Sequence, residues 1–345
     1  MPQEEIYLFV AEWFDPLPML KKQFVLKYFV ETHSCEMFDL KNNRLFLKKS
    51  PLQSNISKSD MSVGSRVLIY GREVDIVDYG DKTTKAKLEV DMESALLIIP
   101  YSLVSNWGAY INKFNEEGLI IKKIKTVFLD NNSVLTLSSI LQQDCSLLMN
   151  GLSVVVNIAG PGGSRKLNEI VNNLNITSQV ICARSAQEAT NVVDAVSQES
   201  STVTLDNCTC CIIKPHSVKS GDFGKILDQI TSQGYEISAM ESVYFDTTTA
   251  EEFLEIYRDV IPDYSDHIIQ LSSGISIAIE LRAQDAVTTF RETCGPWDIQ
   301  MAKELRPQTL RAKFGIDNIR SGVYCTDLPT DGSIDCEYCF KIMDV

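Results

Sequence analysis

The first quarter of the chain alternates short runs of β-branched and aromatic residues with turn-forming residues. The hydrophobic runs cover residues 6–10, 23–29, 44–48, 67–70 and 74–77. Residues of these types are enriched in strands, whereas Gly, Pro, Asn and Asp between the runs favour turns. The pattern predicts a small β-rich domain, a curved sheet or barrel, over residues 1–88.

An internal repeat organises the rest of the chain. The hydrophobic run at residues 95–102 aligns with residues 210–217. After each run comes a helical pattern that ends in a glycine, Gly118 in the first copy and Gly234 in the second, where a helix C-cap is expected. Each copy continues with a strand, further helices and another strand. We therefore expect two copies of one fold.

The composition is typical of a globular protein, with 44% hydrophobic and 23% charged residues. The longest purely aliphatic run, residues 95–99, is far shorter than the ~20 residues that span a bilayer. We predict no signal peptide, because no basic segment precedes an apolar run at the start. Ten cysteines without a secretory signal indicate reduced thiols in a cytosolic or nuclear compartment. We expect no membrane partner.

The net charge of −14 is unevenly distributed. Residues 1–88 carry 13 basic and 12 acidic side chains, whereas residues 89–206 carry 7 and 12, and residues 207–345 carry 12 and 22. The acidic body argues against nucleic acid as a partner, because phosphate-backbone binding needs clustered Lys and Arg. The nearly neutral first segment differs electrostatically from the rest, and we place a domain boundary near residue 88.

Four blocks of the second copy resemble the nucleoside diphosphate kinase family. The blocks are residues 212–215, 291–296, 305–311 and 324–327. Their order and spacing make the resemblance specific for a module over 207–345, and residues 94–200 resemble the same module in a shortened and degraded form. The resemblance implies ferredoxin-like βαββαβ modules, each a four-stranded antiparallel sheet covered by helices. The predicted fold class is thus α+β, with a β-rich N-terminal domain followed by two such modules that pack on each other.

The β-rich start resembles the DM-ten domain that precedes such modules in axonemal proteins. Residues 11–16, 39–48 and 78–81 carry this resemblance. A DM-ten domain followed by two kinase modules is the layout of the nucleoside diphosphate kinase homologue 7 family. By this resemblance the chain is identified as a divergent member of that family.

The family reaction transfers a phosphoryl group through a phosphohistidine, so it needs a nitrogen nucleophile that is partly deprotonated near neutral pH. The resemblance places this histidine where the chain has Tyr324, and Ser321 replaces the family's asparagine. A phenol with a pKa of ~10 stays protonated at neutral pH. A phosphotyrosine is also too low in energy to pass its phosphate on. We expect no kinase activity from this copy.

The first copy lacks the family chemistry altogether. The first copy contains no histidine, since the chain has none between His33 and His216. Ile99 stands where the family has the lysine of the nucleotide pocket. The loop that bears an arginine in the family is largely missing. We predict that this copy is a structural module.

A relic of the nucleotide pocket remains in the second copy. Lys214, Tyr257, Arg291 and Arg311 match family residues that contact the phosphates or the catalytic histidine, while Trp297 replaces a threonine near the phosphate. Two interpretations stay open. The cations hold ion pairs with nearby carboxylates, or the pocket keeps weak binding of a magnesium nucleotide. We predict no other cofactor.

Other tempting motifs are interpreted as structural. We expect His216 in a partly exposed loop and His267 on a helix surface or near a helix N-terminus. We predict no metal site at residues 208–211, because alternation along a strand directs neighbouring sulfurs to opposite faces and four ligands would need a second cysteine pair. Residues 160–164 lack the Lys-Ser/Thr of a phosphate-binding loop, so we expect a turn with Ser164 as a helix N-cap.

The lost nucleophile and the retained shape predict a non-catalytic protein. The resemblance implies a microtubule inner protein of the ciliary or flagellar axoneme, bound to tubulin and other doublet proteins. The nearly neutral β-rich domain suits an acidic tubulin surface better than the acidic modules do. Two alternatives remain: a nucleotide-binding adaptor of centrosomal γ-tubulin complexes that uses Lys214, Arg291 and Arg311, or residual kinase activity.

Overall fold

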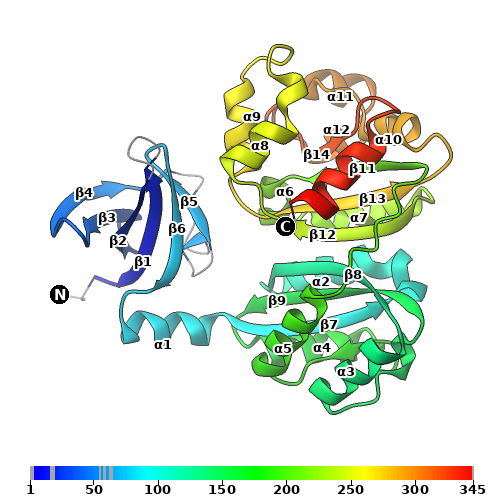
Figure 1. Ribbon diagram of the computed structural model, residues 1–345, viewed down its shortest axis with the longest axis horizontal. Helices are drawn as coiled ribbons and strands as arrows, with labels where there is room; N and C mark the ends of the chain where they lie inside the picture. The colour runs from blue at the N-terminus through cyan, green and yellow to red at the C-terminus, as the bar shows by residue number, and fades with distance from the viewer. Residues whose placement is uncertain (1–3, 16–19, 54–55, 57–59, 62–64, 344–345) are drawn as a thin grey trace. The chain divides into compact units, whose positions relative to one another are not determined.

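Alternation of buried and exposed side chains builds the N-terminal unit around one antiparallel sheet in the order β4-β3-β2-β1-β6-β5 (Figure 1). The strands are β1 Ile6–Asp15, β2 Leu20–Phe29, β3 Ser34–Asp39, β4 Arg44–Pro51, β5 Arg66–Ile69 and β6 Arg72–Tyr79. One face buries a core that includes Phe9, Phe24 and Leu26, each 0% exposed. The β-rich N-terminal region is therefore confirmed, and β3 is a strand that the sequence analysis did not predict.

The structure is a computed structural model that describes residues 4–15, 20–53, 56, 60–61 and 65–343. Pro16, the last residue of one predicted motif, lies outside these ranges. The chain divides into two compact units, Met1–Asp91 and Met92–Val345, and each is described by itself. Within the described residues, no helix is long and apolar enough to cross a membrane.

Helix α1, Lys82–Asp91, completes the N-terminal unit and packs against β1 and β6. The Thr84 hydroxyl accepts a hydrogen bond of 2.9 Å from the backbone N–H of Leu8. Gly80 lies so close to β1 that an added Cβ would meet the carbonyl carbon of Leu8 at 2.9 Å. This helix belongs to the N-terminal unit and runs past the predicted boundary at residue 88.

Eight strands of the C-terminal unit form a second antiparallel sheet, in the order β10-β7-β9-β8-β12-β13-β11-β14. The strands are β7 Glu93–Pro100, β8 Ile120–Leu129, β9 Gly151–Gly160, β10 Ile181–Cys182, β11 Cys208–Ile213, β12 Glu236–Val243, β13 Ser276–Arg282 and β14 Val323–Cys325. Read from its outer edge, each half has its fourth, first, third and second strand side by side. This is the ferredoxin-like order, written twice, as predicted.

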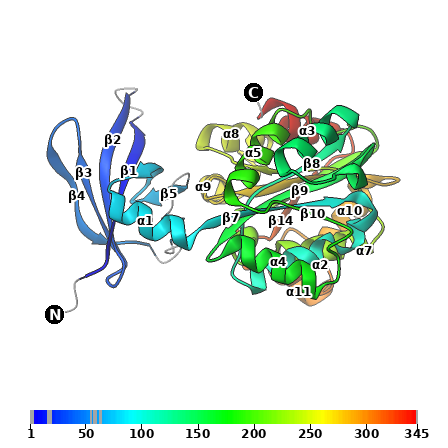
Figure 2. The same cartoon turned by 90° about the horizontal axis from the view of Figure 1, so that it is seen from below.

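Helices cover both faces of this sheet (Figure 2). They are η2 Tyr101–Asn106, α2 Trp107–Glu116, α3 Asn131–Leu141, η3 Ser146–Leu148, α4 Gly163–Asn173, α5 Ala186–Ser197, α6 Pro215–Lys219, α7 Phe223–Ser232, α8 Thr247–Phe253, η4 Glu255–Tyr257, α9 Tyr264–Leu271, α10 Ala286–Cys294, α11 Ile299–Leu305, α12 Leu310–Phe314, α13 Gly332–Glu337 and η5 Tyr338–Ile342. One core, under α2, α4, α7 and α10, runs through both halves. The opposite face carries a separate core in each half.

The start of α4 differs from the prediction. Gly162 is the N-cap residue, in a left-handed conformation with φ of 65°. Ser164 lies inside the helix, and its buried hydroxyl has no hydrogen-bond partner. The predicted Ser164 cap is wrong because a glycine makes the turn without a side-chain cap.

The two halves join through their second strands and their first long helices. β8 pairs with β12 at Lys125 and Glu241, whose side chains form a buried ion pair of 3.2 Å. On the helical face α2 packs against α7 at Gly108 and Gly224, where a Cβ on Gly108 would lie 2.4 Å from the Gly224 carbonyl oxygen. Because the sheet and the helix layer both continue across the junction, the modules form one body.

Candidate functional site

Tyr324 lies in the middle of β14, opposite Ile212 of β11. Its side chain is only 5% exposed, and its hydroxyl donates a hydrogen bond of 2.8 Å to Oδ2 of Asp335. Burial and the nearby Asp335 raise the pKa of Tyr324 well above its ordinary value. Burial also raises the pKa of Asp335, to about 6, which is still far too low for this carboxylate to take the phenolic proton. The position therefore holds a neutral, bonded phenol.

Asp335 was not singled out by the sequence analysis. It lies on α13, eleven positions after Tyr324, and also accepts a hydrogen bond of 2.8 Å from the Thr326 hydroxyl. A buried phenol usually needs a hydrogen-bond partner, so the sequence predicts that such a residue exists but does not say which one it is. Only the packing of α13 on β11 brings the carboxylate to the phenol.

Asp327 contacts two of the predicted pocket residues, Tyr257 and Arg291. Its Oδ2 accepts a hydrogen bond of 2.7 Å from the Tyr257 hydroxyl, and its Oδ1 lies 3.3 Å from Nε of Arg291. The Arg291 side chain is 51% exposed, so this ion pair contributes little to stability. For Arg291 the ion-pair interpretation of the sequence analysis agrees with the structure.

Lys214 and Arg311 are buried, but their partners are not carboxylates. Lys214 Nζ donates to the carbonyl oxygen of Ile319 at 2.9 Å, and Arg311 donates to the carbonyl oxygen of Gly295 at 2.9 Å. Burial and the Arg311 charge lower the pKa of Lys214 to about 7. The ion-pair interpretation is wrong for these two cations, because Lys214 donates to a backbone carbonyl, whereas Arg311 donates to a backbone carbonyl and to Sγ of Cys325 at 3.4 Å.

Trp297 fills the space between the relic residues. Its ring stacks on Tyr257 with centroids 6.3 Å apart, lies 5.6 Å from the His267 ring, and has the Arg311 guanidinium 5.4 Å from its centroid. A cation on the face of an indole is a favourable contact in itself. The indole is thus a direct neighbour of the Arg311 guanidinium.

The two histidines of the second module agree with their predictions only in part: His216 is partly exposed and His267 lies near the start of a helix, as expected, but other features differ. His216 lies in the first turn of α6 instead of a loop, and its Nε2 accepts a hydrogen bond of 3.2 Å from the Gly322 backbone N–H. His267 lies on α9 but is buried at 5% exposure instead of on the surface. Burial and the Lys214 charge lower the pKa of both to about 4. His216 therefore supports the turn that leads into β14.

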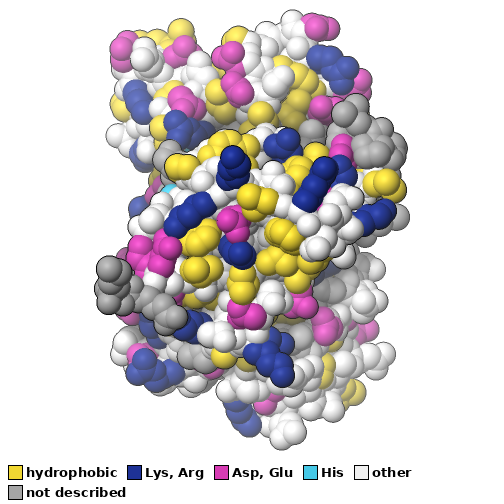
Figure 3. Space-filling model, turned by 90° about the vertical axis from the view of Figure 1, so that its left-hand side faces the viewer, with side chains coloured by type: hydrophobic (Ala, Val, Ile, Leu, Met, Phe, Trp, Pro, Cys, Tyr) yellow, Lys and Arg dark blue, Asp and Glu magenta, His cyan; other side chains and the backbone are white. Residues whose placement is uncertain are grey.

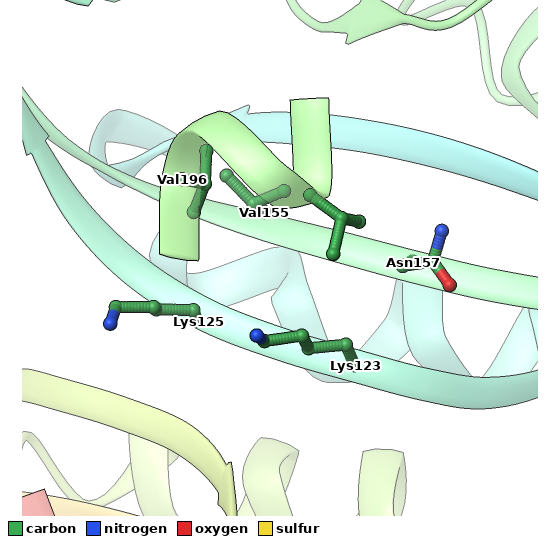
Figure 4. A pocket seen from close by; sticks show the side chains of 6 residues that line it. Lys123, Lys125, Val155, Asn157 and Val196 are labelled. Carbon is green, nitrogen blue, oxygen red and sulfur yellow. The ribbon is translucent and has the colours of Figure 1, made fainter. Parts of the chain in front are cut away.

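The first module offers no comparable constellation. Ile99 is 0% exposed in the core that both halves share. A small hollow of about 10 Å³, partly open to solvent, lies on β8 and β9 beside α5, lined by Lys123, Lys125 and neighbouring side chains (Figure 4). Lys123 donates to Ser197 Oγ at 2.8 Å, and Lys125 pairs with Glu241. The hollow is smaller than the 300–1,000 Å³ typical of ligand sites, and both lysines are already bonded.

Known proteins are similar to this chain both in its C-terminal module and over almost its whole length. The family model for nucleoside diphosphate kinase matches residues 207–345. The nucleoside diphosphate kinase homolog 7 of Rattus norvegicus is 33% identical over 374 residues, covering 99% of this chain and 94% of the relative. The homolog 7 of Mus musculus is 32% identical over 375 residues with the same coverage. A nucleoside diphosphate kinase of Aquifex aeolicus is 33% identical over 137 residues, covering 40% of this chain and 96% of the relative. The resemblance of the first residues to a DM-ten domain stays a prediction.

Proposed function

The chain belongs to the nucleoside diphosphate kinase homologue 7 family, and we propose that it is a non-catalytic structural protein of ciliary or flagellar doublet microtubules, bound to tubulin and neighbouring doublet proteins. One observation carries the non-catalytic part. At the nucleophile position Tyr324 is buried, protonated and hydrogen-bonded to Asp335. A group without an accessible lone pair or a competent base does not attack a phosphate.

The state of the surrounding cations supports the same proposal. Phosphoryl transfer needs cations that spread the charge of the transferring group. Lys214 and Arg311 donate to backbone carbonyls, and Trp297 covers the Arg311 guanidinium. A nucleotide would have to displace these contacts before the cations could reach its phosphates.

A scaffold role agrees with two further features. The modules share one sheet and one core, which favours a rigid body. On the N-terminal unit, Lys22 and Arg72 lie over the Trp13 ring at 5.3 and 5.2 Å, and exposed Phe14 and Leu20 lie on the same sheet. Figure 3 shows one face of the molecule, on which hydrophobic, basic and acidic side chains are interspersed. Such a surface suits an acidic protein partner such as tubulin.

The catalytic part is tested by phosphate transfer from radiolabelled ATP to GDP, using the full chain and its Tyr324→His variant. We expect both proteins to be inactive, because Trp297 and the bonded cations block the pocket beyond the nucleophile. Activity of the variant alone would support an intact nucleotide site and hence the adaptor alternative. Activity of the unmodified chain would refute the proposal.

The location is tested separately in a flagellated cell that expresses the protein. Doublet microtubules are washed with high salt, which removes loosely bound proteins, and the fraction that retains the chain is measured by immunoblotting. We expect retention together with tubulin. Complete release into the wash or the cytosolic fraction would refute the structural role.

A further inference from the structure

Four buried cysteines from the two ends of the second module come together on one side of its sheet. They are Cys208 and Cys210 on β11, Cys336 on α13 and Cys339 on η5, with exposures of 7%, 0%, 0% and 1%. Residues two apart on a strand share a face, and residues three apart share a helix face. The prediction that no second cysteine pair accompanies residues 208–211 is wrong, because Cys336 and Cys339 form such a pair near the end of the chain.

Close packing of α13 on β11 brings the two pairs together. A Cβ on Gly332, the first residue of α13, would lie 2.2 Å from the carbonyl oxygen of Cys208, so only glycine allows this approach. Cys211, the other cysteine of the strand, belongs to the core on the opposite face. The face of β11 that α13 covers therefore carries two sulfurs from the strand.

The sulfur positions are those of a ligand set. Sγ of Cys208, Sγ of Cys336 and a carboxylate oxygen of Glu280 all lie within 4.8 Å of one another. The Cys336 thiol also reaches Cys210, and Sγ of Cys210 lies 4.0 Å from Sγ of Cys339. Sulfurs around a tetrahedral zinc at ~2.3 Å lie about 3.8 Å from each other, so the groups of Cys208, Cys336 and Glu280 need to approach one another by no more than about 1 Å.

Glu280 places a buried carboxylate beside the sulfurs of Cys208 and Cys336, and hydrogen bonds fix its orientation. It lies on β13 directly opposite Cys210 and is 0% exposed. Oε2 accepts hydrogen bonds from the Thr204 backbone N–H at 2.8 Å, from the Thr204 hydroxyl and from Ser238, whereas Oε1 accepts one from the Leu205 N–H at 2.7 Å. Outer partners of this kind orient a metal ligand, and Oε1 keeps a lone pair for a metal.

We propose that Cys208, Cys210, Cys336 and Glu280 form a binding site for a thiophilic divalent cation of the zinc type. Thiolate sulfur selects zinc over magnesium or calcium, so the site is distinct from any magnesium-nucleotide chemistry of the module. Each of the three thiols gives up its proton to solvent as its sulfur bonds to the metal, and the carboxylate binds as it is. The ligands come from β11, β13 and α13, so the metal links the C-terminal helix to the sheet.

The test uses the full chain, stripped with chelator under reducing conditions, desalted, and then given zinc sulfate. Zinc retained after a second desalting is measured by mass spectrometry, and cobalt replaces zinc for absorption spectroscopy. The Cys336→Ala variant removes the sulfur that touches both strand cysteines. Cys145→Ala, a buried thiol of the first module, is the matched control. Cys208→Ala is a second test variant at the slightly exposed end of the site.

We expect about one zinc per chain for the unmodified protein and the control, and thiolate-to-cobalt charge-transfer absorption in both. Each test variant should lose at least about 100-fold in zinc affinity, since even outer partners of a ligand contribute 10- to 100-fold. Zinc at 100 times its Kd should raise the thermal midpoint of the unmodified chain by roughly 5 to 10 °C and leave that of Cys336→Ala unchanged. No zinc uptake by the unmodified chain, or equal uptake by Cys336→Ala and Cys145→Ala, would overturn the proposal.

Discussion

The buried ion pair between Lys125 and Glu241 offers a sharp test of the two-module body. The nitrogen and oxygen lie 3.2 Å apart across the junction of β8 and β12, and the side chains are 6% and 7% exposed. At an effective dielectric constant of about 20, this distance corresponds to an attraction of roughly 5 kcal/mol, most of which offsets the desolvation of the two charges. The pair is therefore weakly stabilising as a whole, and costly to break from one side.

Glu241→Gln should lower the free energy of unfolding by about 3 kcal/mol, because it leaves the Lys125 ammonium buried without a carboxylate. Lys125→Met should have a similar effect, whereas the double variant Lys125→Met/Glu241→Leu should lie within about 1 kcal/mol of the unmodified chain. Glu116→Gln is the control, since its partner Lys113 and Glu116 itself are 49% and 60% exposed, and it should cost less than about 0.5 kcal/mol.

The assay is urea unfolding followed by circular dichroism. With a slope of about 3 kcal/mol per molar urea, the single variants should move the midpoint down by about 1 M and the double variant by no more than about 0.3 M. Effects of the single variants below about 1 kcal/mol would refute the reasoning. So would a double variant whose loss equals the sum of the two single losses, because the charges would then not be coupled.

Four further changes test the site and the packing. Tyr324→Phe should cost about 1–2 kcal/mol in urea unfolding by removing the bond to its carboxylate partner, and no loss would contradict that bond. His267 takes up a proton near pH 6.5 when unfolded but only near pH 4 when folded, so it should contribute about 2–3 kcal/mol to a fall in stability between pH 7 and pH 4, and His216 adds a fall of the same sign; His267→Gln should remove the His267 share and make the fall shallower, and an unchanged profile would exclude this cause. Gly108→Ala should cost more than about 2 kcal/mol, since its Cβ would lie 2.4 Å from the backbone carbonyl oxygen of Gly224, whereas Gly118→Ala, with open space but a φ of +73°, should cost about 1 kcal/mol. Trp297→Thr should produce a thermal shift with magnesium and GDP that the unmodified chain lacks, and equal behaviour would show that the indole does not block binding.

Local patterns were sufficient for most of the fold. Residues 6–10 and 44–48 are rich in the residue types that favour strands, and the internal repeat allowed the second sheet to be predicted from two copies of one pattern. Strand β3 was missed because Ser34, Glu36 and Asp39 dilute its alternation, although Ser34 and Asp39 are buried in the structure. Helix α1 was missed because its apolar content is low, and its docking depends on contacts with β1 and β6.

The sequence predicted the central residues of the candidate site, but it did not predict which atoms they bind. A motif located Tyr324, but which atoms satisfy Lys214 and Arg311 depends on where loops of the fold place backbone carbonyls. The burial of His267 depends on Trp297, thirty positions along the chain, in the same way. Sequence reasoning finds residue types and spacing, whereas partners that approach through tertiary packing need coordinates.

The contacts of Lys214 and Arg311 show how the second module accommodates two buried cations. Buried cations would be destabilising if left unpaired, since each loses its hydration without gaining a partner. Here a lysine and an arginine donate to carbonyls, and an indole supplies a π-face to the guanidinium. Only Nε of Arg311 is left without a hydrogen bond among the donors of the two buried side chains that the structure describes. These contacts stabilise the two buried cations within the module itself, which agrees with the structural role that we propose.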